Sequence, residues 1–254
     1  MNPSLRTENL TIRFGGHAAV DGVNCAFRPG ELTVVVGPNG AGKTTWFNLV
    51  SGQLAPTSGR IFKGEADITG LSPSARAKAG IGRAFQLTNL FPRLSVLENV
   101  RLAVQARHGM GPRLLRPASA FSEIREEAQT YLERTRLAEV AHLPASALPH
   151  GDQRKLEVAL LMAMQPDIYM FDEPTAGMSV DEAPVILELI AEIKRDSSKT
   201  ILLVEHKMDV VRALADRIVV LHNGELIADG RPGEVMNLPV VREIYLGVGA
   251  EEVA

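Results

Sequence analysis

Residues 37–44 read GPNGAGKT and match the pattern G-x-x-x-x-G-K-[ST] at every fixed position. The residues before them, LTVVV at 32–36, are apolar and mostly β-branched, which is typical of a buried strand. A strand that runs directly into this pattern indicates a phosphate-binding loop followed by a helix. We expect that helix to run from about Lys43 to Val50 and to direct its positive N-terminal end at the phosphates.

The chemistry of phosphate binding explains each fixed residue of this loop. Glycines let backbone N–H groups close around phosphate oxygens, the ammonium of Lys43 reaches the β- and γ-phosphates, and the hydroxyl of Thr44 coordinates magnesium. The loop therefore predicts binding of a nucleoside triphosphate together with Mg²⁺. The residues predicted to surround the nucleotide are Gly37, Pro38, Asn39, Gly40, Ala41, Gly42, Lys43, Thr44 and Thr45.

A second apolar run, IYMFDEP at 168–174, ends in two acids. Acids often end strands as solvated turn residues, which is the ordinary interpretation. In a phosphate-binding-loop protein, however, an aspartate at the end of a buried strand can hold the magnesium ion, and a following acid can polarise an attacking water. We therefore predict Asp172 as a metal ligand and Glu173 as the general base. No NKxD-type guanine-reading motif follows, which argues against a GTPase.

The rest of the chain alternates strand and helix patterns. TILLV at 200–204 and RIVVL at 217–221 are further buried-strand runs, and helical periods are expected over 123–140 and 183–195. The helix over 123–140 is marked by apolar residues at Ile124, Ala128, Tyr131 and Leu132. This alternation predicts an α/β fold, with a largely helical subdomain from about Leu87 to Met164 inserted into the sheet-containing core.

Composition restricts the function further. The 254 residues are 45% hydrophobic and carry a net charge of −3, and only 5% are aromatic, so nucleic acid is not an expected partner. Cys25, the single cysteine, lies between apolar neighbours and is predicted to be a buried structural thiol of a protein in a reducing cytosol. The longest strongly apolar run, VALLMAM at 158–164, is too short to span a membrane, and the N-terminus has no apolar signal segment. Any membrane role is expected to act through a partner.

The order of motifs resembles that of the ATP-binding cassette family, the ATPase subunits of ABC transporters. Six motifs follow one another in the same order as in that family. They are TIRFGG at 11–16, GPNGAGKTT, GRAFQ at 82–86, LPHGDQ at 148–153, FDEPTAG at 171–177 and LLVEHKM at 202–208. The resemblance implies a mainly parallel core sheet, an N-terminal antiparallel β-subdomain and an inserted helical subdomain. It implies one ATPase domain over 1–254, with a nucleotide-binding core formed by 1–86 and 165–254 and the helical subdomain by 87–164.

The resemblance also implies roles for residues that are ordinary when taken alone. Phe14 would stack on the adenine of ATP, although an isolated phenylalanine is more often part of a core. Gln86 would contact the magnesium ion and the attacking water, and His206 would hold the γ-phosphate and that water. The implied catalytic set is thus Lys43, Gln86, Glu173 and His206, and the implied metal ligands are Thr44, Gln86 and Asp172.

LPHGDQ stands where the family has its glycine-centred signature, which faces the ATP bound by the other subunit of a dimer. His150, Gly151 and Asp152 are therefore implied to contact that nucleotide in trans, although the stretch could also be an ordinary loop. Pro149 replaces the usual serine and offers neither a hydroxyl nor an N–H, so we expect an altered and weakened signature. Ser179 is a second departure, where many cassettes carry an aspartate that communicates between the two sites.

Within the family, three stretches of this chain resemble those of the ATPases of branched-chain amino-acid importers. They are GRAFQLTNLFPRLSVLENV at 82–100, VEHKMDVV at 204–211 and VVREIYLG at 240–247. That likeness implies a cytoplasmic subunit held at the inner face of the membrane by permease subunits, paired with a second cassette and indirectly served by an extracytoplasmic binding protein. A heterodimer is favoured over a homodimer. The alternatives are a lipopolysaccharide or lipid exporter and a weakly hydrolysing, nucleotide-gated binding module. The basic segment 107–117 fits a solvated loop or a permease or lipid contact and is left unassigned.

Overall fold

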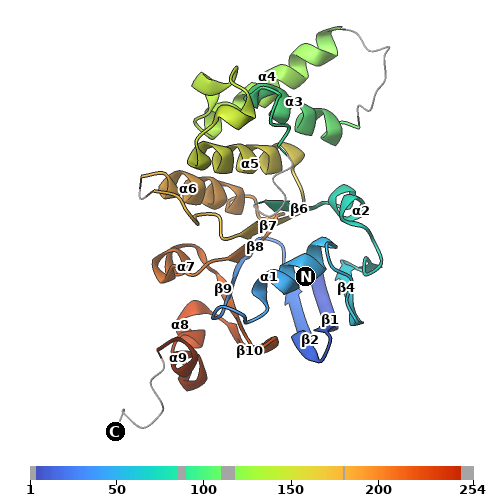
Figure 1. The fold of residues 1–254 in the computed structure, drawn as a ribbon, viewed down its shortest axis with the longest axis vertical. Coiled ribbons are helices and arrows are strands. Elements are labelled where there is room, and N and C mark those ends of the chain that lie inside the picture. The colour runs from blue at the N-terminus through green and yellow to red at the C-terminus, as the bar shows by residue number, and fades with distance from the viewer. Residues whose placement is uncertain (1–3, 85–89, 110–117, 180, 247–254) are drawn as a thin grey trace. The chain divides into compact units, whose positions relative to one another are not determined.

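A computed structural model describes residues 4–84, 90–109, 118–179 and 181–246 of the chain (Figure 1). The chain divides into two compact units. The first comprises Met1–Ile81, Asp167–Glu173 and Lys194–Ala254, and the second comprises Gly82–Pro166 and Pro174–Ile193. The subdomain boundaries inferred from the sequence, 87 and 164, stay a prediction.

An antiparallel sheet forms the N-terminal part of the first unit. Its strands are β1 (Leu5–Phe14), β2 (His17–Phe27), β4 (Ser58–Lys63) and β5 (Ala66–Asp67), in the order β2-β1-β4-β5. Phe14 pairs with His17 across a two-residue loop whose first residue, Gly15, has a positive φ of 58°, as tight hairpin turns require. This sheet confirms the N-terminal antiparallel β-subdomain that the resemblance implied.

A second, mainly parallel sheet has the order β10-β9-β3-β8-β7-β6. Its strands are β3 (Leu32–Val36), β6 (Ile81–Ala84), β7 (Ile168–Asp172), β8 (Thr200–Val204), β9 (Arg217–His222) and β10 (Glu225–Gly230). Every residue of β3, β7 and β8 is buried, which explains why these strands are continuous apolar runs rather than alternating ones. The four strands expected from the sequence are all confirmed.

The helices of the first unit begin with α1 (Lys43–Ser51), which follows the phosphate-binding loop as expected. The others are α2 (Pro73–Lys78), α7 (Met208–Leu214), α8 (Pro232–Val235) and α9 (Pro239–Leu246). Helix α1 is anchored by aromatic packing, because the ring of Trp46 lies 5.4 Å from that of Phe27 and 5.7 Å from that of Phe47. Cys25 is buried in the same core, and burial raises the pKa of its thiol to about 12.

A buried arginine closes the C-terminal end of α1. The side chain of Arg76, on α2, is 1% exposed and donates hydrogen bonds to the carbonyl oxygens of Leu49 and Val50 at 2.6 and 2.7 Å. It also donates to the carbonyls of Thr69 and Leu71. Burial lowers the pKa of the guanidinium, and the negative end of α1 supplies the compensating partial charge.

The second unit contains α3 (Val96–Arg107), α4 (Ala118–Arg134), α5 (His150–Met164), most of α6 (Ala183–Lys194) and two short 3₁₀ turns, Ala138–Val140 and Ala145–Ala147. The helix expected over 183–195 is confirmed to within one residue. The prediction of a helix over 123–140 is wrong at its C-terminal end, because α4 ends at Arg134. Arg136 there has a positive φ of 58°, and Leu137 donates its N–H to the carbonyl of Leu132, which terminates the helix.

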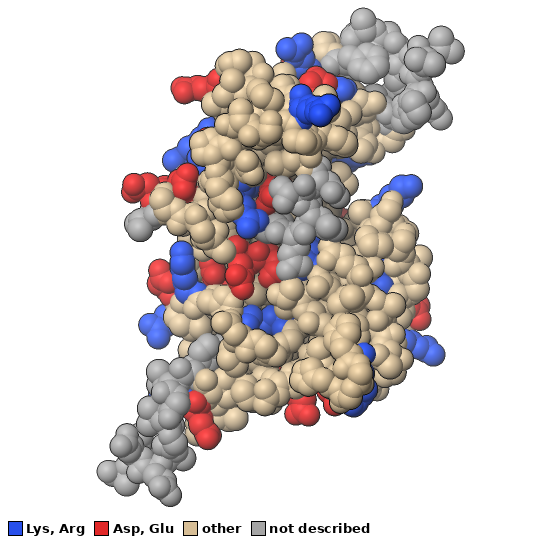
Figure 2. Space-filling view, viewed as in Figure 1, with Lys and Arg blue, Asp and Glu red and all other residues tan. Residues whose placement is uncertain are grey.

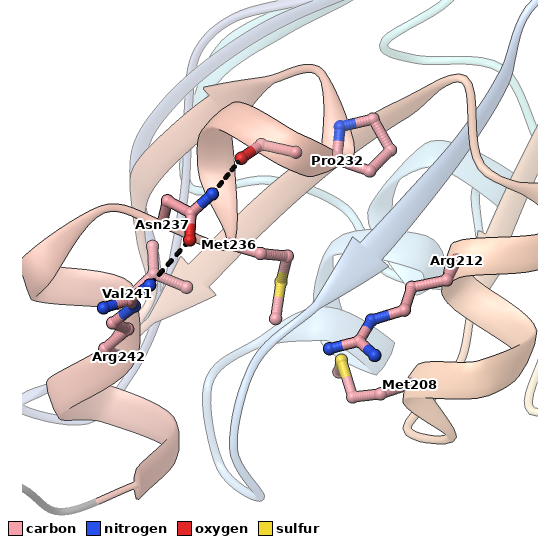
Figure 3. Close-up of a pocket in the computed structure, with 8 residues that line it drawn as sticks. Met208, Arg212, Pro232, Met236, Asn237, Val241 and Arg242 are labelled. Atoms are coloured by element: carbon pink, nitrogen blue, oxygen red, sulfur yellow. Dashed lines mark hydrogen bonds between the residues drawn. The ribbon is translucent and has the colours of Figure 1, made fainter.

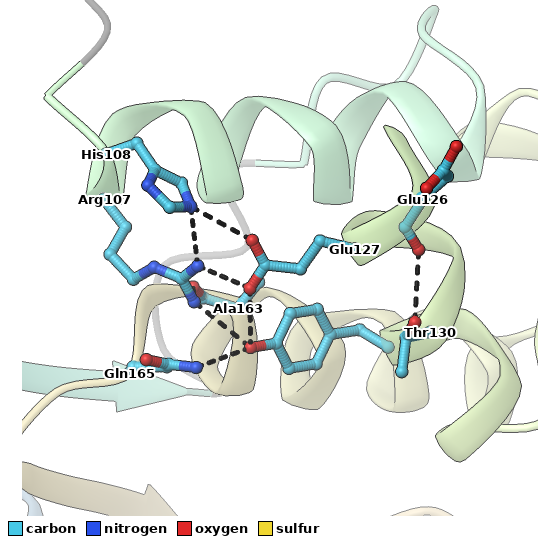
Figure 4. A network of polar contacts seen from close by, with 8 residues as sticks. Arg107, His108, Glu126, Glu127, Thr130, Ala163 and Gln165 are labelled. Carbon is cyan, nitrogen blue, oxygen red and sulfur yellow. Dashed lines mark hydrogen bonds and ion pairs between the residues drawn. The ribbon is translucent and has the colours of Figure 1, made fainter. Parts of the chain in front are cut away.

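Charged side chains tie α3, α4 and α5 together (Figure 4). Arg107, the last residue of α3, contacts Glu127 and the hydroxyl of Tyr131 on α4 and the carbonyl of Ala163 on α5. Burial alone would raise the pKa of Glu127, but hydrogen bonds from Arg107 and His108 lower it below its ordinary value. The network fixes the packing of the three helices around an ion pair.

Acidic and basic side chains are interspersed over the face drawn in Figure 2, in keeping with the small net charge. Within the described ranges, none of the helices is both long and apolar enough to cross a membrane.

Candidate nucleotide-binding site

The carboxyl ends of three adjacent parallel strands bring the predicted site together. Val35 of β3 and Asp172 of β7 both pair with Val204 at the end of β8. The phosphate-binding loop follows β3, Glu173 follows β7, and His206 follows β8 two residues later. Since parallel strands end at the same edge of a sheet, segments far apart in sequence converge here, which is where open α/β sheets bind ligands.

Glycine is required in the phosphate-binding loop for steric reasons. Gly42 is the N-cap of α1 with a positive φ of 97°, and a Cβ there would lie 2.4 Å from the carbonyl oxygen of Ala19. The ammonium of Lys43 is held inside the loop, where it donates hydrogen bonds to the carbonyls of Gly37 and Pro38 at 2.7 and 2.9 Å. Burial lowers the pKa of Lys43, while the negative charges of Glu173 and Asp172 oppose that shift. The loop thus presents a cation and a helix N-terminus to one region.

Glu173 is held in an unusual backbone conformation at the edge of the sheet. Its φ is +51°, which non-glycine residues adopt at an energetic cost and which is found preferentially at functional sites. Its N–H donates to the carbonyl of Val204, and its Oε1 lies 2.7 Å from Nε2 of His206. Both side chains are about 40% exposed, at 41% and 39%, so the pair is accessible to a substrate. The geometry brings together the predicted general base and the predicted γ-phosphate residue.

Sequence reasoning missed Glu205, the residue before His206. It is only 4% exposed, and its Oε2 accepts a hydrogen bond from the N–H of His206 at 2.9 Å. An acid directly after the apolar run TILLV was the available signal, and it parallels the position of Asp172 after IYMF. Glu205 therefore orients the backbone that carries His206.

The residues at this edge fit a magnesium ion. Asp172 is 6% exposed at the end of β7, and Thr44 lies in the first turn of α1, so the donors are carboxylate and hydroxyl oxygens. Oxygen donors are the ligands that Mg²⁺ prefers, usually with few protein groups and several waters or phosphate oxygens. The described residues contain no group of three or more His, Cys, Asp or Glu able to form an all-protein metal site. Gln86, the third predicted ligand, lies outside the described residues.

The remaining predicted residues of the first unit are Phe14 and Thr45. Phe14 is 52% exposed at the end of β1, and an exposed aromatic ring is free to stack on a base. Thr45 follows Thr44 in the first turn of α1 and is partly buried. The roles of both residues stay predictions.

LPHGDQ forms the start of α5 in the second unit. Pro149 is the N-cap with no side-chain hydrogen bond, and α5 begins at His150. Gly151 is buried, whereas His150 is exposed. The carboxylate of Asp152 pairs with Lys155 at 2.8 Å, so its charge is compensated within the helix. The segment is thus a helix N-terminus whose proline leaves it without a side-chain cap.

Ser179 has a structural role that the sequence comparison with an aspartate did not suggest. Its N–H and its hydroxyl both donate to Oε2 of Glu182, at 3.1 and 2.9 Å, just before α6 begins at Ala183. The same carboxylate packs directly on Gly151, because a Cβ on that glycine would lie 2.1 Å from Oε1 of Glu182. These hydrogen bonds lower the pKa of Glu182.

The strand β3, the glycine-rich loop with Lys43 that follows it, and the buried Asp172 at the end of β7, with β8 between the two strands, define this chain as a P-loop nucleotide-binding protein. Comparison with known proteins narrows that class, because the ABC transporter family profile matches residues 20–176. The high-affinity branched-chain amino acid transport ATP-binding protein LivG of Escherichia coli (strain K12) is 42% identical over 250 residues, 96% of this chain and 98% of that protein. BraF of Pseudomonas aeruginosa, of the same description, is 39% identical over 251 residues, with 96% and 98% covered.

Solved structures agree with this assignment. The ADP conformation of MJ1267, an ATP-binding cassette of an ABC transporter, superposes with a TM-score of 0.80 at 31% identity, covering 98% of this chain and all of that one. The ATP-binding cassette MJ0796, in a dimeric post-hydrolysis state with ADP and Pi, gives a TM-score of 0.77 at 27% identity, covering 89% and 98%. The chain belongs to the ABC transporter family, as an ATP-binding ATPase.

Proposed function

We propose that this chain is the ATP-hydrolysing subunit that energises an importer of branched-chain amino acids or a related small solute. Relatives named for that transport align over nearly the whole of both chains. The single structural observation that carries the proposal is the contact between Glu173 and His206 at the carboxyl edge of the core sheet, beside the phosphate-binding loop. This arrangement supports hydrolysis as well as binding.

Different groups of this chain have different roles in ATP hydrolysis. Lys43 and the backbone N–H groups of residues 39–45 bind the phosphates, with the ammonium of Lys43 reaching the β- and γ-phosphates. Mg²⁺, held by Thr44 and Asp172 with Gln86 as the further predicted ligand, would neutralise charge on the phosphates. Glu173 accepts the proton of the attacking water, and its hydrogen bond to His206 fixes the direction of that carboxylate.

We further propose that the working unit is a pair of cassettes bound to membrane permease subunits, with an extracytoplasmic binding protein supplying the solute. A dimeric cassette among the similar solved structures supports the pairing. In a head-to-tail pair, each ATP lies between one chain's phosphate-binding loop and the other chain's signature. A homodimer would therefore carry the Pro149 defect at both sites, whereas a partner with a serine would keep one strong site. This reasoning favours a heterodimer.

The alternatives are less well supported. An exporter of lipopolysaccharide or lipid would use the same site residues, but the relatives compared above are named for amino-acid transport. A nucleotide-gated binding module would not need a general base, whereas Glu173 is held in a costly backbone conformation beside His206.

Uptake by a reconstituted transporter tests the function. The chain would be co-expressed with permease subunits and a second cassette of a branched-chain amino-acid importer, and uptake of labelled leucine would be measured in vesicles loaded with ATP. We expect uptake to require ATP and the binding protein and to be lost in Lys43→Ala, with Lys78→Ala on the exposed end of α2 as the matched control. ATP-dependent uptake of another solute class, without leucine transport, would refute the cargo assignment.

The weakened signature has its own test. Pro149 has φ −56° and ψ 158°, nearly the values of Ser95, which caps α3 at −64° and 159°, so the backbone at 149 accepts serine. One restored hydrogen bond to a charged phosphate is worth about 1.5–3 kcal/mol, or about 10- to 150-fold. We expect slow hydrolysis by the isolated chain and a faster rate in Pro149→Ser. A fast isolated chain that serine leaves unchanged would remove the argument for a heterodimer.

A further inference from the structure

A cavity of about 740 Å³ lies in the first unit, and none of its lining residues is one assigned to ATP (Figure 3). Helix α7 forms one side through Met208 and Arg212, and α8 and α9 with the turn between them form the other through Met236, Val241 and Arg242. Its volume is within the range of small-molecule sites. Figure 3 shows the thioether of Met236 directed into the space between the two sides.

Among the described residues, those that line this cavity carry charge of one sign. Arg212 and Arg242 line it, and no carboxylate of the described residues does. Neither arginine forms an ion pair with any residue in the described parts of the chain, whereas buried or half-buried arginines such as Arg107 and Arg217 do. Arg242 donates a hydrogen bond to Oδ1 of Asn237 at 2.6 Å, and Asn237 in turn donates to the carbonyl of Gly233. The guanidinium of Arg242 is thus oriented by a fixed amide.

The apolar part of the lining complements these cations. Met208 and Met236 are partly buried and offer unbranched thioethers that adapt to irregular aliphatic shapes, and Val241 is fully buried below them. Arginine recognises carboxylates through paired N–H donors. The described lining therefore combines an apolar floor with two anion-binding groups, and none of its described residues offers a carboxylate to an ammonium.

We propose that this cavity binds a small monocarboxylate with an aliphatic body and no ammonium group. The carboxylate contacts Arg212 and Arg242, and the aliphatic body lies against the two methionines. A zwitterionic amino acid is disfavoured because its ammonium would lose hydration without gaining an anionic partner. Such a ligand bridges α7 to α8 and α9, and Met208 lies two residues after His206, so occupancy restrains the helix that follows the catalytic histidine.

Calorimetry with the full chain and three probes of one aliphatic body tests the proposal. The probes are isocaproate, its neutral amide isocaproamide, and leucine, which adds an ammonium to isocaproate; acetate tests the need for the body. We expect isocaproate to bind at least about 10-fold more tightly than each of the others, since one charged hydrogen bond is worth about that factor. Equal binding of isocaproate and isocaproamide, or tighter binding of leucine, would overturn the assignment. So would no measurable binding of isocaproate.

Variants separate the site from non-specific association. Arg212→Met and Arg242→Met each keep the length of the side chain and should weaken isocaproate about 10-fold or more, while Arg60→Met on the exposed face of β4 should not. Met236→Asp places a carboxylate in the cavity and should abolish binding. Hydrogen exchange of the amides of α7 should slow when isocaproate is added to the wild-type chain. Unchanged affinity in both arginine variants, or unchanged exchange in α7, would refute the site. None of these measurements depends on ATP hydrolysis, so a negative result would refute this site without affecting the proposed function.

Discussion

Replacing Arg76 by methionine tests how the phosphate-binding helix is anchored. Methionine keeps the aliphatic stem but removes four hydrogen bonds, to the carbonyls of Leu49 at 2.6 Å, Val50 at 2.7 Å, Thr69 at 2.7 Å and Leu71 at 3.1 Å. The buried carbonyl of Val50 loses the bond from Arg76, which costs about 1–3 kcal/mol, whereas the carbonyl of Leu49 keeps a bond from the N–H of Gly52 at 3.2 Å. The other three bonds are worth about 0.5–1.5 kcal/mol each, and the loss of the buried cation recovers part of its desolvation cost. We expect a net loss of about 3–5 kcal/mol in the free energy of unfolding, and about 10 °C in the midpoint of thermal unfolding.

Urea denaturation followed by circular dichroism, with a thermal scan beside it, measures this loss. Arg60→Met is the matched control, because Arg60 is exposed on β4 and forms no ion pair with the described residues. The control should change stability by less than about 0.5 kcal/mol. If Arg76→Met costs less than about 1 kcal/mol, the carbonyls at the end of α1 have other partners and the anchoring argument is wrong.

Glu173→Gln should abolish steady-state ATP hydrolysis while preserving ATP binding, measured by phosphate release and calorimetry, because the amide cannot accept the proton of water; normal turnover would remove Glu173 from the mechanism. Gly151→Ala should cost about 1–2 kcal/mol by displacing the carboxylate of Glu182 from its two hydrogen bonds with Ser179, and adding Glu182→Ala should cost little more; additive losses in urea denaturation would contradict this coupling. Cys25 should resist alkylation at pH 8 in the folded chain and react after denaturation, since a thiol pKa of about 12 leaves almost no thiolate; rapid labelling of the native chain by mass spectrometry would refute its burial.

The sequence predicted the core sheet because its strands are buried on both faces. A strand covered on both sides needs apolar residues at every position, so β3, β7 and β8 stand out as continuous runs. The phosphate-binding loop was predictable for a related reason, since a Cβ at Gly42 would collide with the carbonyl of Ala19, and glycine is required at that fixed position. Local chemistry determined both features.

Other features depend on contacts between distant segments, which leave no local pattern. Arg76 lies in a short polar helix and looks like a surface residue, yet it is 1% exposed because it reaches the end of α1. Ser179 was interpreted only as a missing aspartate, although its N–H and hydroxyl hold the carboxylate of Glu182. Arg136 carried no signal that α4 would end before it, because positive φ in an arginine is imposed by the surrounding packing. The predicted contacts of Gln86 fall outside the described residues and stay a prediction.

Helix α1 couples stability to nucleotide binding, because its two ends are held by different kinds of interaction. At the N-terminal end, Gly42 packs on the carbonyl of Ala19, and Lys43 is bonded to the loop's own carbonyls. At the C-terminal end, Arg76 neutralises the negative end of the helix dipole. The positive end is therefore left for the phosphates, while the negative end is compensated by a cation that has no role in binding. A helix secured in this way keeps its N–H groups in place before the nucleotide arrives, so less of the binding free energy is lost in ordering the loop. This preorganisation is why a residue on α2, far along the chain from the loop, belongs in any account of how the site binds ATP.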